Sequence, residues 1–531
     1  MRLIFLIVLP ILSGLIAYIL PNVRGKISTI GIQLVSLGAA VYNFKRVSDE
    51  GVYSFVVGNY HRQAGITLTS DLLSSAMILL TVFVFLMCMI YAKNNTKLES
   101  HFYFLYLVLQ SCMIALFITR DLFNIFVIIE VCTIIIAMLI MYKNEKSLYD
   151  SLIYLMNNSV AMIFFVFGIA ILYKNLHSLN LDVLAVRIGE TQLNGSYIAA
   201  YAMLLTGISF KCALMPMFSW LPRAHAAKGV PTVVSAVLSG LYIKTGVFVF
   251  IRLREVFLPL IDIDGYLLII TMITSILGVV MAMKQNNIKL IMAYSTISQV
   301  GLIMSGILLG NRVSYSGAVY HLINHVIFKS TLFLCAGIYI KHYGHKDIRR
   351  MRGAFKSLPL VSTSCLFAVL GVTGAPFFNG SISKYFIQYG AKGSPVEYLI
   401  VLINIGTIIY FLKFLRILPG PSSLSSEVSC RFKTLTVSIL GIICLLGGLL
   451  AQGLMKTLLA FEDLIDPQTY LHKGIIYLVT LFFCWLFSRK DTLKLRVSEK
   501  RRYSPSFNGI SLMTCTFFMV TSIAMYLTNR I

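Results

Sequence analysis

The chain has 531 residues, of which 58% are hydrophobic and only 12% charged, and its formal net charge is +24. A soluble globular protein carries about 25% charged residues, and half that share cannot cover the surface of a soluble particle of this length. The composition therefore excludes a soluble protein and indicates an integral membrane protein, in which each helical span needs about 20 apolar residues.

Long apolar runs recur along the chain with short polar breaks between them. No break is long enough for a soluble domain, and the run at 3–20 is too long for the apolar part of a signal peptide, so we expect it to be kept as a first span. The runs predict an all-α polytopic membrane protein with about 14–16 transmembrane helices, at 2–20, 28–43, 70–92, 102–119, 121–142, 150–173, 196–222, 231–251, 257–283, 288–309, 315–340, 358–390, 396–418, 433–455, 471–488 and 508–527.

The basic excess of 45 Lys and Arg over 21 Asp and Glu lies in short runs between the apolar segments. No basic domain is present, so we expect membrane lipids and not nucleic acid as the partner of these charges. Basic loops face the cytoplasm, and alternate loops carry the larger basic clusters, at 341–356 and 489–502. This pattern predicts a multi-pass protein of the cell (inner) membrane with both termini on the outer side.

Two spans are interrupted. The seventh contains Pro216 in KCALMPMFSWLP, and the twelfth reads LGVTGAPFFNGSISK with Pro376 and three glycines. Broken helices are tolerated in lipid where the freed backbone is buried in protein or lines a wet cavity. Each break could be a packing accommodation, but two breaks five helices apart favour two inverted five-helix repeats, spans 4–8 and 9–13. We therefore expect four parts: 1–100 with helices 1–3, 101–255 and 256–420 with one repeat each, and 421–531 with the C-terminal helices.

Ionisable residues at membrane depth carry the functional interpretation, because a charge at the bilayer centre costs at least about 2.5–3.5 kcal/mol. Glu130 lies in the middle of FNIFVIIEVCTIIIAM, as either a structural acid paired with a lysine or a proton or cation site. Lys211 lies just before the first break. It either snorkels to the interface or, since burial favours its uncharged form, accepts and releases a proton.

Further basic groups follow in later spans. Lys244 in SGLYIKTGVFVFIR is deep in the eighth span, as a structural or a functional lysine. His321, His325 and Lys329 share one face of a helix because they are four residues apart, and imidazole titrates near neutral pH. This spacing favours a proton relay over a His/His metal pair, which lacks a third ligand nearby.

Two more residues belong to this set. Lys384 follows the second break in NGSISKYF and is the counterpart of Lys211 if the repeat holds. His225, in the loop after the seventh span, is a loop-packing residue or a gate. The ten cysteines form no Cys-x-x-Cys motif, and no nucleotide-binding loop is present. We expect no bound cofactor or metal ion and no catalytic centre within this chain.

Three stretches resemble a known family: LTGISFKCALMPMFSWLPRAHAAKGVPTVVSAVLSGLYIKTGVFVFIR, IKLIMAYSTISQVGLI and YHLINHVIFKSTLFLCAGIYI. They look like the antiporter-like membrane subunits of respiratory complex I, the D subunits of Mrp-type cation/proton antiporters and the large membrane subunits of membrane-bound hydrogenases. The resemblance covers roughly 70–415. It implies a core of 14 helices with two inverted five-helix repeats and broken helices 7 and 12.

The resemblance also implies roles. A Glu on the fifth helix pairs with a Lys on the broken seventh, which here are Glu130 and Lys211. The proton then passes from Lys211 to the lysine that releases it, Lys384, through the central relay formed by Lys244, His321, His325 and Lys329. The sequence departs from the family pattern at Arg223, where an acid is common, and at Gly380-Ser381, where Gly-Phe is common.

The leading hypothesis is a proton-translocating subunit of a multisubunit complex that is redox-driven, as in complex I or a membrane-bound hydrogenase. It is then part of an oxidoreductase complex, with other membrane subunits and a peripheral redox arm as partners. The alternative is the D subunit of an Mrp-type Na⁺/H⁺ antiporter, which exchanges Na⁺ for H⁺. A second alternative is a non-conducting structural subunit, which does not need ionisable residues at the relay positions.

Overall fold

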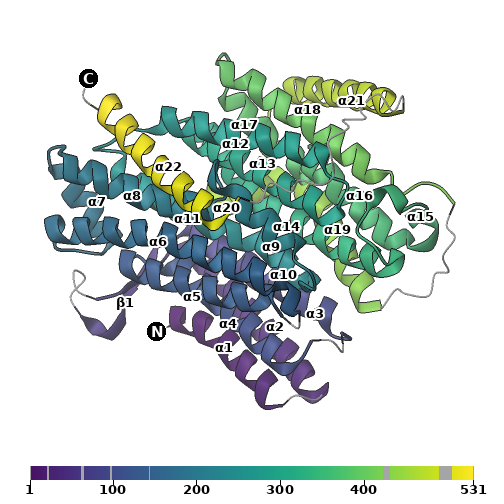
Figure 1. Cartoon of the computed structure of the whole chain (residues 1–531), viewed down its shortest axis with the longest axis horizontal. Coiled ribbons are helices and arrows are strands. Elements are labelled where there is room, and N and C mark those ends of the chain that lie inside the picture. The colour runs from purple at the N-terminus through teal and green to yellow at the C-terminus, as the bar shows by residue number, and fades with distance from the viewer. Residues whose placement is uncertain are drawn as a thin grey trace.

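The computed structural model describes residues 2–20, 23–60, 65–95, 98–142, 144–421, 431–463, 465–489 and 505–529. Helices make up most of this part of the chain (Figure 1). Twelve of its helices are long and apolar enough to cross a membrane. The predicted all-α polytopic class is confirmed. The basic cluster predicted at 489–502 lies outside the residues whose side chains are described, so the orientation of the termini stays a prediction.

The N-terminal part packs at one side of the molecule, shown in purple in Figure 1. Its helices are α1 (Arg2–Ile19), α2 (Val23–Glu50) and α3 (Leu72–Ala92). Between α2 and α3 the chain forms an antiparallel hairpin of β1 (Tyr53–Val56) and β2 (Thr67–Ser70), with Tyr53 opposite Ser70. We expected only a polar loop here, because two strands of four residues are too short to give an alternating apolar pattern.

The predicted first repeat contains α4 (Ser100–Ile118), α5 (Leu122–Ile140), α6 (Leu148–Leu176), α8 (Gly195–Lys211), α9 (Trp220–Ala226), α10 (Thr232–Val237) and α11 (Ile243–Phe257). The short amphipathic helix α7 (Leu181–Glu190) was not predicted. It buries Leu181, Leu184 and Ile188, and the Asn180 side chain caps its N-terminus. Ten residues cannot span a bilayer, and for that reason α7 gave no long apolar run.

The second group contains α12 (Asp264–Lys284), α13 (Ile288–Leu308), α14 (Arg312–Tyr343), α15 (Ala354–Ser357), α16 (Pro359–Thr373), α17 (Asn379–Gly390) and α18 (Pro395–Leu415). Helix α14 is the centre of the packing: it contacts α13, α16, α17 and α10 and is buried over most of its length. Both predicted breaks are present, between α8 and α9 and between α16 and α17. The inverted symmetry of the two groups, and with it the four predicted parts, stay predictions.

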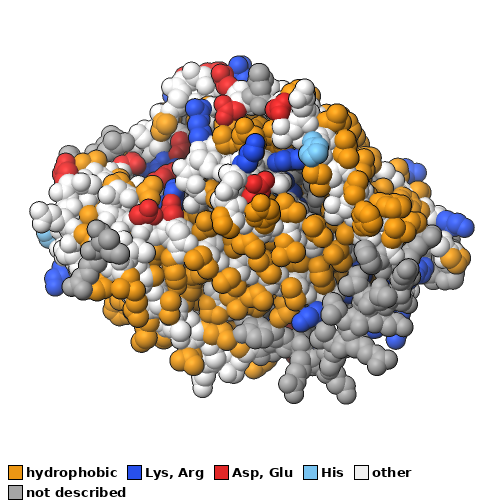
Figure 2. Space-filling model, turned by 90° about the horizontal axis from the view of Figure 1, so that it is seen from above, with side chains coloured by type: hydrophobic (Ala, Val, Ile, Leu, Met, Phe, Trp, Pro, Cys, Tyr) orange, Lys and Arg blue, Asp and Glu red, His pale blue; other side chains and the backbone are white. Residues whose placement is uncertain are grey.

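The C-terminal part contains α19 (Arg431–Leu449), α20 (Ala451–Leu459), α21 (Pro467–Arg489) and α22 (Phe507–Thr528). Helix α21 lies against α18, and α22 crosses α8 and α6 (Figure 1). Large apolar side chains cover a broad area of the surface in Figure 2, and examples such as Phe167 and Ile269 are more than half exposed. Apolar surface of this extent is typical of a protein that faces lipid or other membrane subunits.

Candidate functional site

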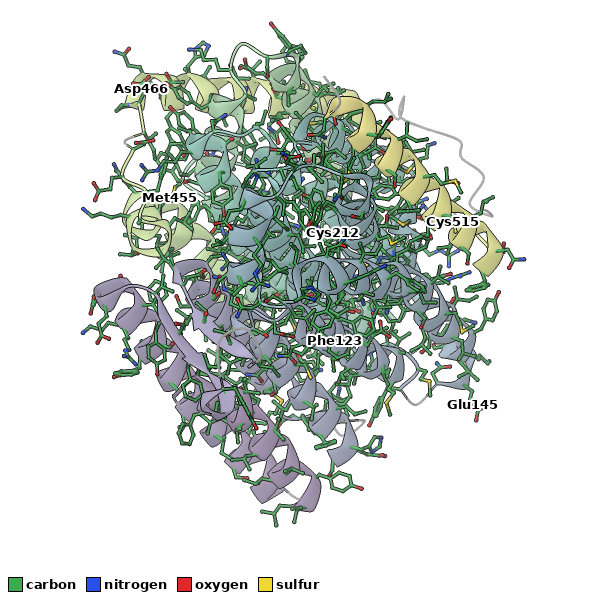
Figure 3. All side chains as sticks on the ribbon, turned by 90° about the vertical axis from the view of Figure 1, so that its left-hand side faces the viewer. Phe123, Glu145, Cys212, Met455, Asp466 and Cys515 are labelled. Atoms are coloured by element: carbon green, nitrogen blue, oxygen red, sulfur yellow. The ribbon has the colours of Figure 1, made fainter. Side chains whose placement is uncertain are left out.

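The first break positions Lys211. Helix α8 ends at Lys211, and the next regular helix, α9, begins only at Trp220. Pro216 has no N–H to offer to the carbonyl of Cys212, so the α-helical pattern cannot continue through it. Cys212 lies near the middle of the molecule in Figure 3, whereas Glu145 and Asp466 lie at its edges. The break therefore brings the end of a helix and its lysine into the protein interior.

Lys211 is buried among hydroxyl groups. Its Nζ donates hydrogen bonds to Thr133 Oγ1 at 2.6 Å and to the Tyr242 hydroxyl at 3.0 Å. The Tyr242 hydroxyl also lies 2.9 Å from the Tyr154 hydroxyl. Each of these oxygens can both accept and donate a hydrogen bond, so the Lys211 ammonium sits at one end of a hydroxyl chain.

Glu130 lies on α5, one turn before Thr133. It is partly exposed, and its Oε1 accepts a hydrogen bond of 2.9 Å from Asn158 Nδ2 on α6. Both Glu130 and Lys211 are described, and no ion pair joins them within 4.0 Å. The direct pair that the resemblance implies is therefore not formed in this structure; Lys211 instead binds one turn farther along α5, at Thr133.

Lys244 is fully buried just beyond a π turn, Leu238–Tyr242, between α10 and α11. Its Nζ donates to the carbonyl oxygen of Ser239 in that turn, at 2.5 Å. A π turn breaks the ordinary i to i−4 ladder and is frequent at functional sites. The turn therefore supplies the polar contact that a buried lysine needs.

His321, His325 and Lys329 lie on the central helix α14, and all three are fully buried. The His321 ring nitrogens lie 2.8 Å from Ser383 Oγ on α17 and 3.0 Å from Gln299 Oε1 on α13. The ring centroids of His321 and His325 are 6.3 Å apart. This helix therefore carries a row of titratable groups through the core.

Lys329 and His325 differ in their polar contacts. Lys329 Nζ donates to Ser295 Oγ at 2.6 Å and to the Met292 carbonyl at 3.2 Å, both on α13. Neither ring nitrogen of His325 has a hydrogen-bond partner among the residues described. On α14, His325 lies one helical turn from His321 on one side and from Lys329 on the other.

Lys384 follows the second break, on α17. Gly374, in the left-handed region at φ +85°, ends α16, and a Cβ there would lie 3.1 Å from Lys384 Cδ. A Cβ on Gly380 would overlap the carbonyl oxygen of Gly371. Glycine at these two positions lets the half-helices approach each other beside Lys384. Lys384 Nζ is buried and has no hydrogen-bond partner among the residues described.

Arg223 and His225 lie on the short helix α9, so the prediction that His225 lies in a loop is wrong. His225 is fully buried, its ring stacks on Phe333 with centroids 4.6 Å apart, and both of its ring nitrogens lack hydrogen-bond partners in the described part of the chain. Arg223, at the position where the resemblance would place an acid, forms an ion pair with Asp150 on α6, with Nε 3.3 Å from Oδ1. The departure at Arg223 is therefore matched by an acid from a neighbouring helix.

The structure adds polar residues to the predicted set. They are the uncharged partners of the buried lysines and histidines: Thr133, Tyr154, Asn158, Tyr242, Ser295, Gln299 and Ser383. The Asn157–Asn158 pair inside an apolar span was a usable signal in the sequence, because amides are costly in lipid. Single Ser, Thr and Tyr residues are common in membrane spans, so they gave no comparable signal in the sequence.

The arrangement is suited to moving protons. Several buried amines and imidazoles share a region of low dielectric, where simultaneous charging of all of them is unfavourable. Hydroxyl groups contact these amines, and neither ring nitrogen of His325 has a hydrogen-bond partner among the residues described. Ordered water commonly satisfies such buried polar groups. The site can therefore hold a small number of protons on its amines and imidazoles.

Known proteins resemble the chain over most of its length. A family model described as NADH:quinone oxidoreductase/Mrp antiporter, TM matches residues 119–410. The D subunit of the Na(+)/H(+) antiporter of Alkalihalophilus pseudofirmus is 31% identical over 399 residues, which are 72% of this chain and 79% of the relative. The N subunit of the NADH-quinone oxidoreductase of Desulforudis audaxviator is 26% identical over 432 residues, 78% of this chain and 85% of the relative.

Two solved assemblies contain chains with the same fold. A chain of the Mrp complex from Dietzia sp. DQ12-45-1b aligns with a TM-score of 0.79 at 20% identity, covering 90% of this chain and 99% of its own length. A chain of the membrane-bound sulfane sulfur reductase, an archaeal respiratory membrane complex, aligns with a TM-score of 0.81 at 22% identity, covering 91% and 99%. Both neighbours are subunits of larger membrane complexes.

Proposed function

Because the chain belongs to the NADH:quinone oxidoreductase/Mrp antiporter transmembrane family, we propose that it translocates protons as an antiporter-like subunit of a multisubunit membrane complex. Its partners are then other membrane subunits, as in the assemblies that contain its structural neighbours. Membrane lipid covers the remaining apolar surface. The four-part organisation and the outer location of both termini belong to the same proposal.

The observation that carries the proposal is the position of His325. It is fully buried, it lies one helical turn from His321 and from Lys329 on α14, and neither of its ring nitrogens has a partner among the residues described. A structural histidine is normally hydrogen-bonded. An unpartnered imidazole between a second histidine and a lysine on the same helix is instead suited to receive a proton from one side and give it to the other.

The proposed route runs from α8 to α17. Lys211 takes up the proton beside Thr133 and Tyr242 and passes it toward Lys244, two residues after Tyr242 on the chain. His325, His321 and Lys329 form the central relay, and Lys384 releases the proton. Bridging water connects groups that do not touch.

Glu130 is the proposed control point. Its carboxylate is partly exposed on the surface of this chain, where a neighbouring subunit can approach it, and it attracts the Lys211 ammonium electrostatically. A change of charge in that neighbour alters the stability of the protonated Lys211. Loading of Lys211 is therefore coupled to events outside the chain.

We propose that Na⁺/H⁺ exchange drives or uses this movement. The relative at 31% identity is the D subunit of a Na(+)/H(+) antiporter, which favours the antiporter alternative over the redox-driven hypothesis. The redox-driven complex remains the second candidate, since the N subunit of an NADH-quinone oxidoreductase is 26% identical and a chain of a sulfane sulfur reductase shares the fold. A non-conducting subunit is disfavoured because every position of the predicted relay carries an ionisable residue.

The experiment uses the assembled complex in sealed vesicles with a pH-sensitive dye inside. An imposed Na⁺ gradient is expected to drive proton movement. Proton movement that needs an electron donor and ignores the Na⁺ gradient would select the second candidate. Proton movement that occurs without a Na⁺ gradient and without an electron donor would exclude both the antiporter and the redox-driven complex.

A further inference from the structure

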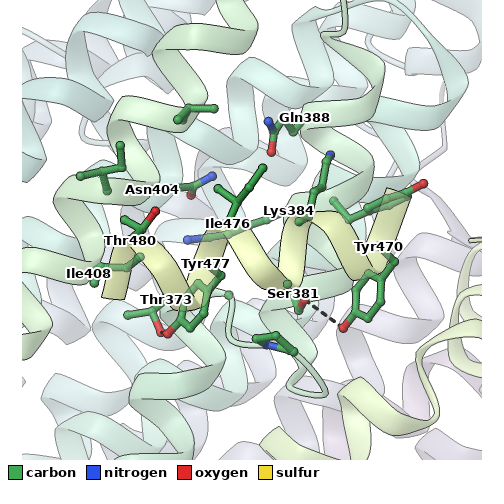
Figure 4. Close-up of a pocket in the computed structure, with 17 residues that line it drawn as sticks. Thr373, Ser381, Lys384, Gln388, Asn404, Ile408, Tyr470, Ile476, Tyr477 and Thr480 are labelled. Carbon is green, nitrogen blue, oxygen red and sulfur yellow. Dashed lines mark hydrogen bonds between the residues drawn. The ribbon is translucent and has the colours of Figure 1, made fainter. Parts of the chain in front are cut away.

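A cavity of about 220 Å³ lies beside Lys384. Its walls come from the end of α16, from α17, from α18 and from the C-terminal helix α21 (Figure 4). A water molecule occupies about 30 Å³ in the liquid, so the cavity has room for several. In Figure 4 Lys384 lies behind α21, which crosses in front of it.

Two atoms in the wall need a hydrogen-bond partner that the described residues do not supply. Lys384 Nζ is a donor, and Asn404 Oδ1 on α18 is an acceptor; both atoms are buried. Burying a polar group without a hydrogen-bond partner is unfavourable. A donor and an acceptor facing the same cavity are the groups that a short chain of water would satisfy.

Two tyrosines of α21 hold the broken helix. The Tyr477 hydroxyl lies 2.9 Å from Thr373 Oγ1 at the end of α16. The Tyr470 hydroxyl lies 3.0 Å from Ser381 Oγ on α17 and accepts a hydrogen bond of 3.2 Å from the Phe377 backbone N–H in the connection. Residues seven apart lie on the same helix face. One face of α21 therefore bonds to both halves of the break.

Lys473 lies between these tyrosines on the same face of α21. It lines the cavity, and its Nζ lies 4.5 Å from the centroid of the Tyr385 ring. The charges of Glu397, at the start of α18, and of the exposed Lys392 act on it. Lys473 therefore lies in the cavity wall, beside Tyr385 of α17.

We propose that α21 is the cover of a hydrated release cavity at Lys384. Tyr470 and Tyr477 are positioning residues that keep the two half-helices closed under it, and Lys473 is a further ion-transfer residue in the cavity wall. The ion that passes is the proton of the proposed function, so this part rests on that function. The cover itself does not.

The cover is tested in the assembled complex by thiol labelling. Asn404→Cys places a thiol in the cavity wall, where none of the lining residues is a cysteine, and a small methanethiosulfonate reagent probes it. Adding Tyr470→Phe and Tyr477→Phe removes both hydroxyl contacts and is expected to raise the labelling rate at least about threefold, since the bonds that keep α21 on the break are lost. Tyr398→Phe, at a 78% exposed position on α18, is the matched control.

An equal labelling rate in the double tyrosine variant and in the control would overturn the cover. Should the double variant fail to assemble, each single tyrosine variant is read in the same way. Labelling does not depend on transport. A wild-type complex that moves no protons would therefore end the proposed function and leave the cover to be judged by labelling alone.

Lys473 is tested by transport. The titratable groups around it are Lys384, Tyr385, Lys392, Glu397, Tyr470 and Tyr477. Lys473→Gln is expected to slow proton movement about tenfold and to change its pH profile, because a base in the cavity wall is lost. Lys456→Gln, in a pair with Glu462 on the exposed surface, is the control and keeps the wild-type rate. A wild-type rate and pH profile in Lys473→Gln would remove Lys473 from the release path.

Discussion

The Lys211 ammonium donates a hydrogen bond of 2.6 Å to the Thr133 hydroxyl, one helical turn from Glu130 on the same helix. The acid and the lysine do not touch, so Thr133 holds the lysine in the position where the acid can influence it. A carboxylate acts at a distance in a low dielectric, and the hydroxyl fixes that distance.

Thr133→Val tests this relationship. Valine keeps the shape of threonine but loses the hydroxyl, and a hydrogen bond to a charged group contributes about 1.5–3 kcal/mol. We expect proton movement to slow by about 10- to 100-fold, and Thr133→Ser, which restores a hydroxyl, to recover most of the rate. Initial rates of dye quenching in vesicles measure both variants; a Val variant as fast as the Ser variant would show that the bond is dispensable.

Glu130→Gln removes the charge and keeps a side chain that can still bond to Asn158. We expect translocation to be strongly impaired while the protein remains inserted and assembled, because the charge that acts on Lys211 is gone. Glu145→Gln changes an exposed acid before α6 and serves as the control. Proton translocation at the wild-type rate in Glu130→Gln would show that Glu130 has only a structural role.

The sequence predicted the spans and their breaks well, since both follow from local physics. A span is a run of apolar residues of bilayer thickness, and Pro216 interrupts a helix wherever it lies. The buried lysines and histidines also stood out, because lipid penalises charge. The contact of Tyr470 with Ser381 could not be predicted in the same way, since it joins residues 89 positions apart. Nor could the Lys211–Thr133 bond, because a lone hydroxyl in a span carries no signal.

Gly380→Ala tests the packing of the second break. The added Cβ would overlap the Gly371 carbonyl oxygen, and overpacking of this kind costs about 1–3 kcal/mol or more. We expect a lower unfolding temperature of the purified complex and a lower yield. Gly265→Ala, whose Cβ would meet nothing within 4 Å, is the control. An unchanged unfolding temperature in Gly380→Ala would mean that the half-helices do not approach this closely.

Asp71, at the start of α3, links three segments through Arg120 and Arg252. Burial alone would raise the pKa of its carboxyl, but the two guanidinium groups and the Ser74 N–H outweigh burial, so the pKa lies below its usual value. A lowered folded-state pKa stabilises the protein above the unfolded value, about 3.9, and this stabilisation is lost as the pH falls through the folded value.

Asp71→Asn is therefore expected to lower the unfolding temperature at pH 7. The difference from the wild type should begin to shrink as the pH falls below about 4, and it should vanish only below the lowered folded-state pKa, where the wild-type carboxyl also becomes neutral. Unfolding scans from pH 7 to pH 3 measure both proteins. A difference that stays constant over this range would contradict a contribution from the ionised carboxylate.

The central claim is that Lys211 carries the proton. The most direct test is proton uptake by vesicles containing the reconstituted complex, with wild-type chain or with Lys211→Ala, after checking that both assemble. We predict that Lys211→Ala abolishes coupled proton uptake, since it removes the base at the break. Proton uptake at the wild-type rate in Lys211→Ala would contradict the relay.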